Sequence, residues 1–199
     1  MSIKTLAAAI KKTHPSFNDD ILASGIQNFE KIEVKAKEVI LEACKTCHYI
    51  YFAPSSIIRC YYLNQKGEEH TLWMKPEASL LTEYKSYVTQ QPSTFSLQCY
   101  EDTELYRISR ENLFKLYSEH TDWALFGIHL TEAVHVSLID VFVNLLSNDA
   151  TRNYQYIAYA FPRFIQVAPL KDIASILQIS AVSLSRIRSG TQTKDNAEY

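Results

Sequence analysis

The stretch Val167-Ala-Pro-Leu-Lys-Asp-Ile-Ala-Ser-Ile-Leu-Gln-Ile-Ser-Ala-Val-Ser-Leu-Ser-Arg-Ile-Arg188 decides the fold of this chain. Its apolar residues have the spacing of two short helices packed across a tight turn. Pro169 suits the first position of the first helix, and Ser180 can cap the second. The pattern is typical of a helix-turn-helix, although an ordinary αα-hairpin has the same spacing.

Basic and hydroxyl side chains point outward from the predicted second helix, and a lysine lies at the start of the first. Such groups suit contacts with the phosphates and base edges of DNA. The local charge agrees, because residues 150–191 hold five basic side chains and one acidic side chain. We therefore predict double-stranded DNA as a partner, with these contact residues: Lys171, Ser180, Ser183, Arg186 and Arg188.

Charge is divided unevenly along the 199 residues. The whole chain carries 20 basic and 22 acidic side chains, a net charge of −2, which excludes a wholly basic protein that coats nucleic acid. Residues 1–149 have a net charge of −5, whereas residues 150–199 have a net charge of +3. The sequence therefore describes an acidic body with a basic terminal module.

Upstream of this module, residues 29–108 are rich in Val, Ile, Tyr, Phe and Thr. The short runs that we predict as strands are 38–42, 49–52, 57–63, 69–74, 94–100 and 103–108. The clearest hairpin turns at Gly67, which supplies the positive φ of its corner. Residues 74–92 have helix-like spacing, an excursion that often caps a barrel mouth where small ligands bind. Together these runs indicate an antiparallel barrel or sandwich.

Helices surround this β region. An N-terminal amphipathic helix ends before Pro15, and Asn18 can cap a second short helix. Residues 153–161 predict a further helix, which Pro162 ends, and a loop follows as far as Pro169.

Between the β region and the basic module lies a long helical segment over residues 123–147, with Thr121-Asp122 as its cap. This segment is apolar on nearly all sides, so two of its sides must pack against other parts of the protein. One side can lie on the barrel, and the other needs a partner helix, which predicts a homodimer. No apolar stretch approaches the roughly 18 residues that cross a bilayer, so we expect a cytoplasmic protein with no membrane partner.

This order of parts resembles the Crp/Fnr family of bacterial transcription regulators. The stretch quoted first is similar to the family pattern R-V-P-L-x-x-I-A-S-x-L-G-I-T-P-x-(S/T)-L-S-R-I-R. The hairpin Ile58-Arg-Cys-Tyr-Tyr-Leu-Asn-Gln-Lys-Gly-Glu-Glu-His-Thr-Leu-Trp73 is similar to G-x-x-R-x-Y-x-x-x-x-G-x-E-x-T-L-x.

The resemblance implies an α+β fold in three parts. An antiparallel β-barrel of the cyclic-nucleotide-binding-like jelly-roll type, with N-terminal helices, would occupy residues 1–120. A dimerisation helix would follow over 121–148, and a helix-turn-helix DNA-binding domain over 149–199. The implied function is DNA-binding transcription regulation by a homodimer.

Departures from the family pattern affect the expected effector. Family barrels that hold cyclic AMP use a Gly-Glu pair for the ribose and an Arg followed by Ser or Thr for the phosphate. The corresponding places here read Pro76-Glu77 and Pro92-Ser93. Glu77 and Ser93 are therefore the candidate pocket residues, but no arginine meets the phosphate. We expect no tight binding of cyclic AMP, and a barrel without any ligand is the alternative to one with another small effector.

The DNA end departs as well. Gln178 replaces the turn glycine, and Ala181 and Val182 stand where base-reading residues often lie. Neither of these two side chains can form a bidentate bond with a base. A second hypothesis is therefore a dimeric module that binds a small ligand or a protein and has a degenerate helix-turn-helix.

Other residue patterns support neither an enzyme nor a metal site. Cys44-Lys-Thr-Cys47-His48 lacks the second ligand pair of a structural zinc site. With only 4 glycines, the chain has no Gly-rich phosphate loop, and no G-x-S-x-G or H-E-x-x-H motif occurs. We expect no enzymatic activity and no metal cofactor.

Overall fold

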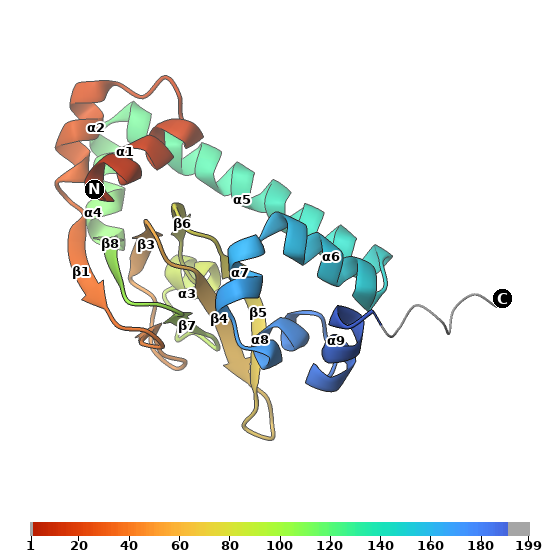
Figure 1. Ribbon diagram of the computed structural model, residues 1–199. Helices are drawn as coiled ribbons and strands as arrows, with labels where there is room; N and C mark the ends of the chain where they lie inside the picture. Colours follow the sequence, from red (N-terminus) through yellow and green to blue (C-terminus); the bar gives the residue numbers. More distant parts are fainter. Residues whose placement is uncertain (1, 191–199) are drawn as a thin grey trace.

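The computed structural model describes residues 2–190 and shows two packed β-sheets flanked by helices (Figure 1). Each sheet is antiparallel and four-stranded, with the strand orders β1-β8-β3-β6 and β2-β7-β4-β5. This interleaving of strands is that of a jelly roll, as expected. The strands are β1 Glu30–Val34, β2 Val39–Leu41, β3 Tyr49–Ala53, β4 Ile58–Leu63, β5 Glu69–Lys75, β6 Ser79–Leu81, β7 Ser96–Cys99 and β8 Thr103–Ser109.

All six predicted strands form, and their apolar side chains make the core between the sheets. The β4–β5 hairpin turns at Gly67, whose φ is +78°, and a bulge interrupts its register at Cys60/Tyr61. Two strands were not predicted. β1 reads Glu-Lys-Ile-Glu-Val and buries only Val34, and β6 has three residues and lies within the excursion before the short helix α3 (Tyr84–Thr89).

Two N-terminal helices, α1 (Ser2–Thr13) and α2 (Asp19–Ile26), pack against the start of the long helix. Leu6 and Ile10 are fully buried on one face of α1. Asn18 caps α2, because its side-chain oxygen accepts hydrogen bonds from two backbone amides of the first turn. Both helices and this cap agree with the prediction.

After α4 (Arg110–Glu119) comes the long helix α5 (Thr121–Ser147). The expected cap is wrong, because Thr121 and Asp122 are already helical and His120 precedes the helix without a side-chain capping bond. The Asp122 carboxylate instead accepts a hydrogen bond from the Asn18 backbone amide, 3.0 Å away.

α5 is covered only at its beginning. Trp123 and Phe126 belong to the core of the β domain, and the remaining turns extend across the molecule toward the C-terminal helices (Figure 1). The expectation that no stretch reaches membrane-spanning length is also wrong, because α5 is long enough and apolar enough by length and composition. The large exposed apolar side chains of α5 are Leu125, Ile128, Val136, Leu138, Ile139, Phe142, Val143 and Leu146.

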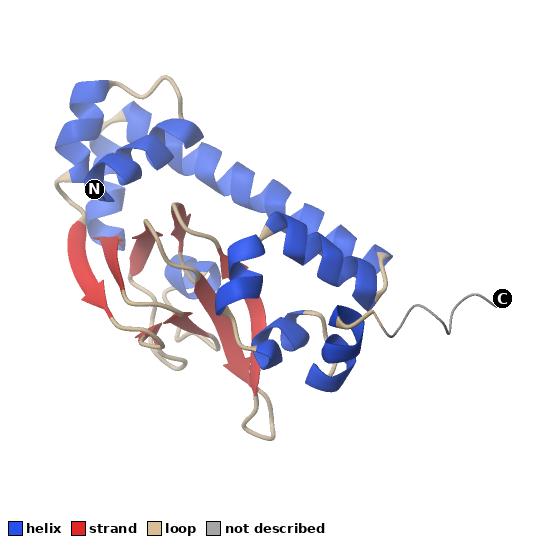
Figure 2. Ribbon diagram, in the orientation of Figure 1, coloured by secondary structure: helices blue, strands red, loops and turns tan. Residues whose placement is uncertain are grey.

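Within residues 2–190, four helices follow α5 (Figure 2): α6 Ala150–Ala160, α7 Pro162–Val167, α8 Leu170–Ile176 and α9 Ala181–Arg188. Their buried apolar side chains belong to a second core. The prediction of a loop between Pro162 and Pro169 is wrong, because α7 occupies most of this segment. Pro162 starts α7, because a first-turn position needs no amide donor. Pro169 precedes α8 as its N-cap rather than starting it. Residues 191–199 of the expected DNA-binding domain lie outside the described residues.

Candidate nucleic-acid interface

α8 and α9 form a helix-turn-helix around a small apolar core. Ile173 and Ala174 of α8 and Leu184 of α9 are buried where the two helices meet. Gln178 takes the left-handed conformation at the turn, with φ +56°, where the family pattern has glycine. Ser180 caps α9 through a hydrogen bond that its hydroxyl accepts from the Ser183 amide, 3.0 Å away. The predicted pair of helices and its cap are therefore present.

Four of the five predicted DNA-contact residues lie on or just before α9. Ser180, Arg186 and Arg188 are exposed, and Ser183 is half-buried. The Ser180 and Ser183 hydroxyls lie 2.9 Å apart and together present hydrogen-bonding groups at the amino end of α9. The two arginines lie in its last turn. α9 therefore offers a hydroxyl-lined end and a cationic end on an exposed helix.

The fifth predicted residue, Lys171, lies apart from this group. It is on α8, and its ammonium group is 3.1 Å from Glu69 Oε2 of strand β5. α8 packs directly against β5, so the helix-turn-helix lies against the β4–β5 hairpin (Figure 1). The structure thus places Lys171 at the contact between the two cores.

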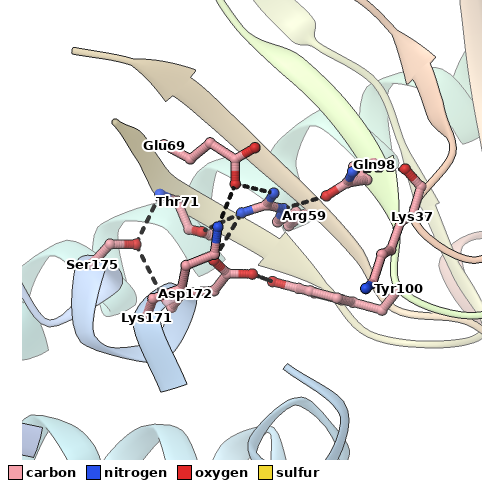
Figure 3. Close-up of polar contacts among 9 residues, drawn as sticks. All are labelled: Lys37, Arg59, Glu69, Thr71, Gln98, Tyr100, Lys171, Asp172 and Ser175. Atoms are coloured by element: carbon pink, nitrogen blue, oxygen red, sulfur yellow. Dashed lines mark hydrogen bonds and ion pairs between the residues drawn. The ribbon is translucent and has the colours of Figure 1, made fainter. Parts of the chain in front are cut away.

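Arg59 of β4 is the centre of that contact (Figure 3). Its Nη2 donates to Glu69 Oε2 at 2.7 Å, and its Nε donates to Gln98 Oε1 at 2.8 Å. Its Nη1 lies 3.0 Å from Asp172 Oδ1 of α8, an ion pair that is not aligned as a hydrogen bond. Arg59 and Asp172 are both buried, with side-chain exposures of 4% and 2%. A buried charge must be paired, and here each partner comes from a different core.

Two further hydrogen bonds join α8 to the barrel. The Tyr100 hydroxyl donates to Asp172 Oδ2 at 3.0 Å. The Thr71 backbone amide of β5 donates to the Ser175 hydroxyl of α8 at 2.9 Å. We refer to the ionic part of this contact as the Arg59 network, which consists of Arg59, Glu69, Tyr100, Lys171 and Asp172.

The surroundings of the network shift its pKa values. Burial works to lower the pKa of Arg59, but the hydrogen bond to Glu69 and the charge of Asp172 outweigh it and raise that pKa. Burial, together with the Asp172 carboxylate, raises the pKa of the Tyr100 hydroxyl. Arg59 therefore stays charged, and Tyr100 keeps the proton that it donates.

Glu69 makes the contact sensitive to acid. The hydrogen bond from Arg59 lowers the pKa of the Glu69 carboxyl below its ordinary value of 4.5; partial burial opposes this effect, and Lys171 adds to it. A carboxyl with a lowered native pKa stabilises the fold fully above its unfolded pKa, and that stability is lost as the pH falls through the native value.

We therefore expect the free energy of unfolding to fall more steeply below pH 4.5 in the wild type than in Glu69→Gln. The difference should be below about 1 kcal/mol, because Glu69 is partly exposed. Urea titrations between pH 7 and pH 3.5, followed by tryptophan fluorescence, measure it. If the free energy of unfolding fell equally with pH in both proteins, Glu69 would not be the source of the acid sensitivity.

Apolar contacts and a third ion pair complete the contact between the cores. Ile57, next to β4, is buried among residues of the C-terminal helices that include Phe164. Arg163 of α7 donates to both carboxylate oxygens of Glu101, at 3.1 and 2.9 Å. The C-terminal helices are therefore held to the barrel by one continuous apolar and ionic surface.

Sequence reasoning did not single out Arg59, Tyr100 or Asp172. One signal was present, because Arg59 is a charged residue within an otherwise apolar run, 57–63. A charged side chain in a buried strand requires a partner of opposite charge. Nothing local could name that partner, since Asp172 lies 113 residues further along the chain.

Comparison with known proteins agrees with this architecture. The family model of the cyclic nucleotide-binding domain matches residues 31–120. No curated protein sequence matches the chain.

Three solved structures share its shape. FixK2 from Bradyrhizobium japonicum is 15% identical, with a TM-score of 0.66 and coverage of 83% of this chain and 85% of that one. A protein from Eubacterium rectale assigned to the crp/fnr family is 16% identical, with a TM-score of 0.65 and coverage of 90% and 86%. The Catabolite Activator Protein from Thermus thermophilus is 19% identical, with a TM-score of 0.55 and coverage of 89% and 85%.

The chain has the fold of the Crp/Fnr proteins, and its residues 31–120 are similar to the cyclic nucleotide-binding domain. The resemblance seen in the sequence is thereby confirmed at the level of fold.

The structure places the two predicted pocket residues, Glu77 and Ser93, in different surroundings. Glu77 lines a cavity of about 90 Å³ between the barrel and α7, and Ser93 is not among the residues that line it. Ligand pockets usually have about 300–1,000 Å³. Ser93 is buried, and its hydroxyl bonds to the Phe95 backbone. The buried carboxylate of Glu83, which the sequence analysis did not select, caps α3.

The four cysteines lie in different surroundings. Cys44 is exposed, Cys47 is buried beside the Thr82 hydroxyl, and Cys60 and Cys99 are buried in the core. Burial raises the pKa of the Cys99 thiol to about 12, so this thiol stays protonated. Within residues 2–190, no group of three His, Cys, Asp or Glu side chains could hold a metal ion.

Proposed function

We propose that the chain is a cytoplasmic, homodimeric transcription regulator that binds double-stranded DNA through α9. The observation that carries the proposal is the exposure of Ser180, Arg186 and Arg188 on a capped helix of a helix-turn-helix. The second helix of this motif enters the major groove. A role in regulation, rather than catalysis, agrees with the names of the structural neighbours, one of which is an activator protein.

The amino end of α9 limits how sequence could be read. Ala181 and Val182 are exposed there, and Val182 is 63% exposed. These side chains can contact a thymine methyl group but cannot form the bidentate bonds that discriminate bases by about 1–3 kcal/mol. We infer that affinity comes mainly from phosphate contacts and that sequence preference is weak or depends on DNA shape.

Replacing Arg186 with alanine tests the interface. We expect Arg186→Ala to weaken binding to duplex DNA about 5- to 50-fold and to reduce the slope of log affinity against log salt by about one. Fluorescence anisotropy of a labelled duplex between 50 and 300 mM salt measures both quantities.

Lys4→Ala is the matched control, because it removes one exposed positive charge on α1, at the N-terminal end of the chain. Its affinity and slope should equal those of the wild type. An Arg186→Ala protein that binds like Lys4→Ala would remove α9 from the interface.

Ala181 and Val182 also favour a second candidate function. A dimer that binds a small ligand or another protein would need no base-reading side chains at these positions. Such a module would show no steep salt dependence with any duplex, so the same titration separates the two functions. For either function we infer an effector other than cyclic AMP, since the family's phosphate-binding arginine position is occupied here by Pro92, next to Ser93.

A further inference from the structure

The contact between α8 and β5 engages a basic side chain of the first helix of the helix-turn-helix, where this motif approaches the DNA backbone. In this motif the first helix crosses the DNA backbone while the second enters the groove. The first helix here is α8, and its first turn carries Lys171. That turn lies against β5, and Figure 1 shows the β4–β5 hairpin extending past α8.

Glu69 pairs with the lysine that the sequence predicts as a phosphate contact. Its Oε2 accepts from Arg59 at 2.7 Å and lies 3.1 Å from the Lys171 ammonium (Figure 3). A DNA phosphate that approached Lys171 would meet this carboxylate at close range and would be repelled.

The buried pair Arg59–Asp172 stabilises the packing of α8 on β5, which we call the docked state. Asp172 is 2% exposed, and only while α8 stays on the barrel does Arg59 offset its charge and the Tyr100 hydroxyl donate to its Oδ2. The Thr71 backbone amide donates a further hydrogen bond to the Ser175 hydroxyl across the same contact. Lys171 alone could exchange partners freely, because its side chain is 66% exposed, but the buried pair holds α8 in place.

We propose that the Arg59 network is an autoinhibitory contact: it holds the helix-turn-helix on the barrel in a state that competes with DNA, and tight binding requires α8 to leave β5. The inference rests on the proposed DNA-binding function. Because DNA would bind only the released state, DNA and docking oppose each other to the same extent.

Two variants weaken the contact without removing a buried charge. Glu69→Gln removes the carboxylate that holds Lys171, and Arg59 keeps its partner Asp172. Tyr100→Phe removes one hydroxyl donor to Asp172 with no change in charge, and its ring stays beside Phe164. Glu68→Gln is the matched control, because it makes the same charge change on the same hairpin, where Glu68 bonds only locally, to Asn64.

The full chain is titrated against a labelled duplex of fixed sequence at 100 mM salt. We expect Glu69→Gln and Tyr100→Phe to bind about 5- to 10-fold more tightly than Glu68→Gln, which should bind like the wild type. Hydrogen exchange at the Thr71 amide should be faster in both unlocking variants, and adding the duplex should accelerate it in the wild type.

The outcomes separate this inference from the function on which it rests. If Tyr100→Phe or Glu69→Gln binds no more tightly than Glu68→Gln, or more weakly, the docked state is not inhibitory and the inference fails while DNA binding stands. If no protein of the set binds any duplex, the proposed function fails and takes the inference with it, although exchange at Thr71 still reports on docking.

Discussion

Phe142→Glu is expected to dissociate the proposed homodimer into monomers. Phe142 is 60% exposed on α5, and Ile139, Val143 and Leu146 surround it at helical spacing. All four lie on one face of the helix and are uncovered in a single chain. If this face pairs with a second α5, Phe142→Glu would bury two carboxylates in an apolar seam, and each carboxylate would lack a partner.

The expected effect on assembly is large. Burying a phenylalanine contributes about 1.5–3 kcal/mol, and an unpaired buried charge costs several kcal/mol more, so the dissociation constant should rise by about 1,000-fold or more. Sedimentation equilibrium of wild type and variant measures this directly. DNA affinity should fall by about 100- to 10,000-fold, because two linked recognition helices become one.

Ser137→Glu is the matched control for this prediction. Ser137 lies on the other face of α5 with Asp140 and Asn144, where a further charge stays in water. This polar face also argues for a partner helix rather than a lipid bilayer, since lipid would leave it unsolvated. A Phe142→Glu protein that remains a dimer would place the interface elsewhere.

Features that are decided by neighbouring residues could be predicted from the sequence. Asn18, Gly67 and Ser180 were predictable because caps and tight turns are decided within a few residues. The six strands were predictable because β-branched and aromatic residues mark half-buried pleated surfaces. The helix-turn-helix was predictable because its apolar spacing is fixed by one short crossing.

Features that depend on distant partners were not predictable. β1 has the charged sequence of an exposed helix turn, yet it pairs with β8, about seventy residues away. The Thr121-Asp122 pair looked like a cap, but Asp122 bonds to Asn18 across 104 residues.

In the candidate interface, too, some features follow from neighbouring residues and others depend on distant partners. Its exposed residues on α9 follow from the sequence, whereas the role of Lys171 changes when Glu69 is placed beside it. A sequence can show that Arg59 needs an acid, but only the packing of α8 on β5 supplies Asp172.

The second large effect is expected at Gly25, where α2 crosses α5. A Cβ atom at this position would lie 2.3 Å from Trp123 Nε1 and 2.4 Å from two carbons of the same indole. Trp123 has no room to move, because it is fully buried and Phe17, Phe29 and Phe126 pack around it. Gly25 is therefore required by a close approach between two helices.

We expect Gly25→Ala to lower the free energy of unfolding by about 3 kcal/mol, at the upper end of the range for overpacked cores. For a chain of this length the melting temperature should fall by about 6–12 °C. Gly67→Ala is the comparison, because its added Cβ meets nothing within 4 Å and its cost, about 1–2 kcal/mol, comes from the left-handed backbone alone.

A double-mutant cycle identifies the cause. Trp123→Phe removes part of the indole that the new Cβ would strike, so Gly25→Ala should cost less in that background than in the wild type. Because Trp123 anchors the first turn of α5, the same clash should also loosen the junction between the barrel and the exposed apolar face of that helix. Equal costs of Gly25→Ala in both backgrounds would show that the glycine is needed for its backbone and not for the space it leaves to Trp123.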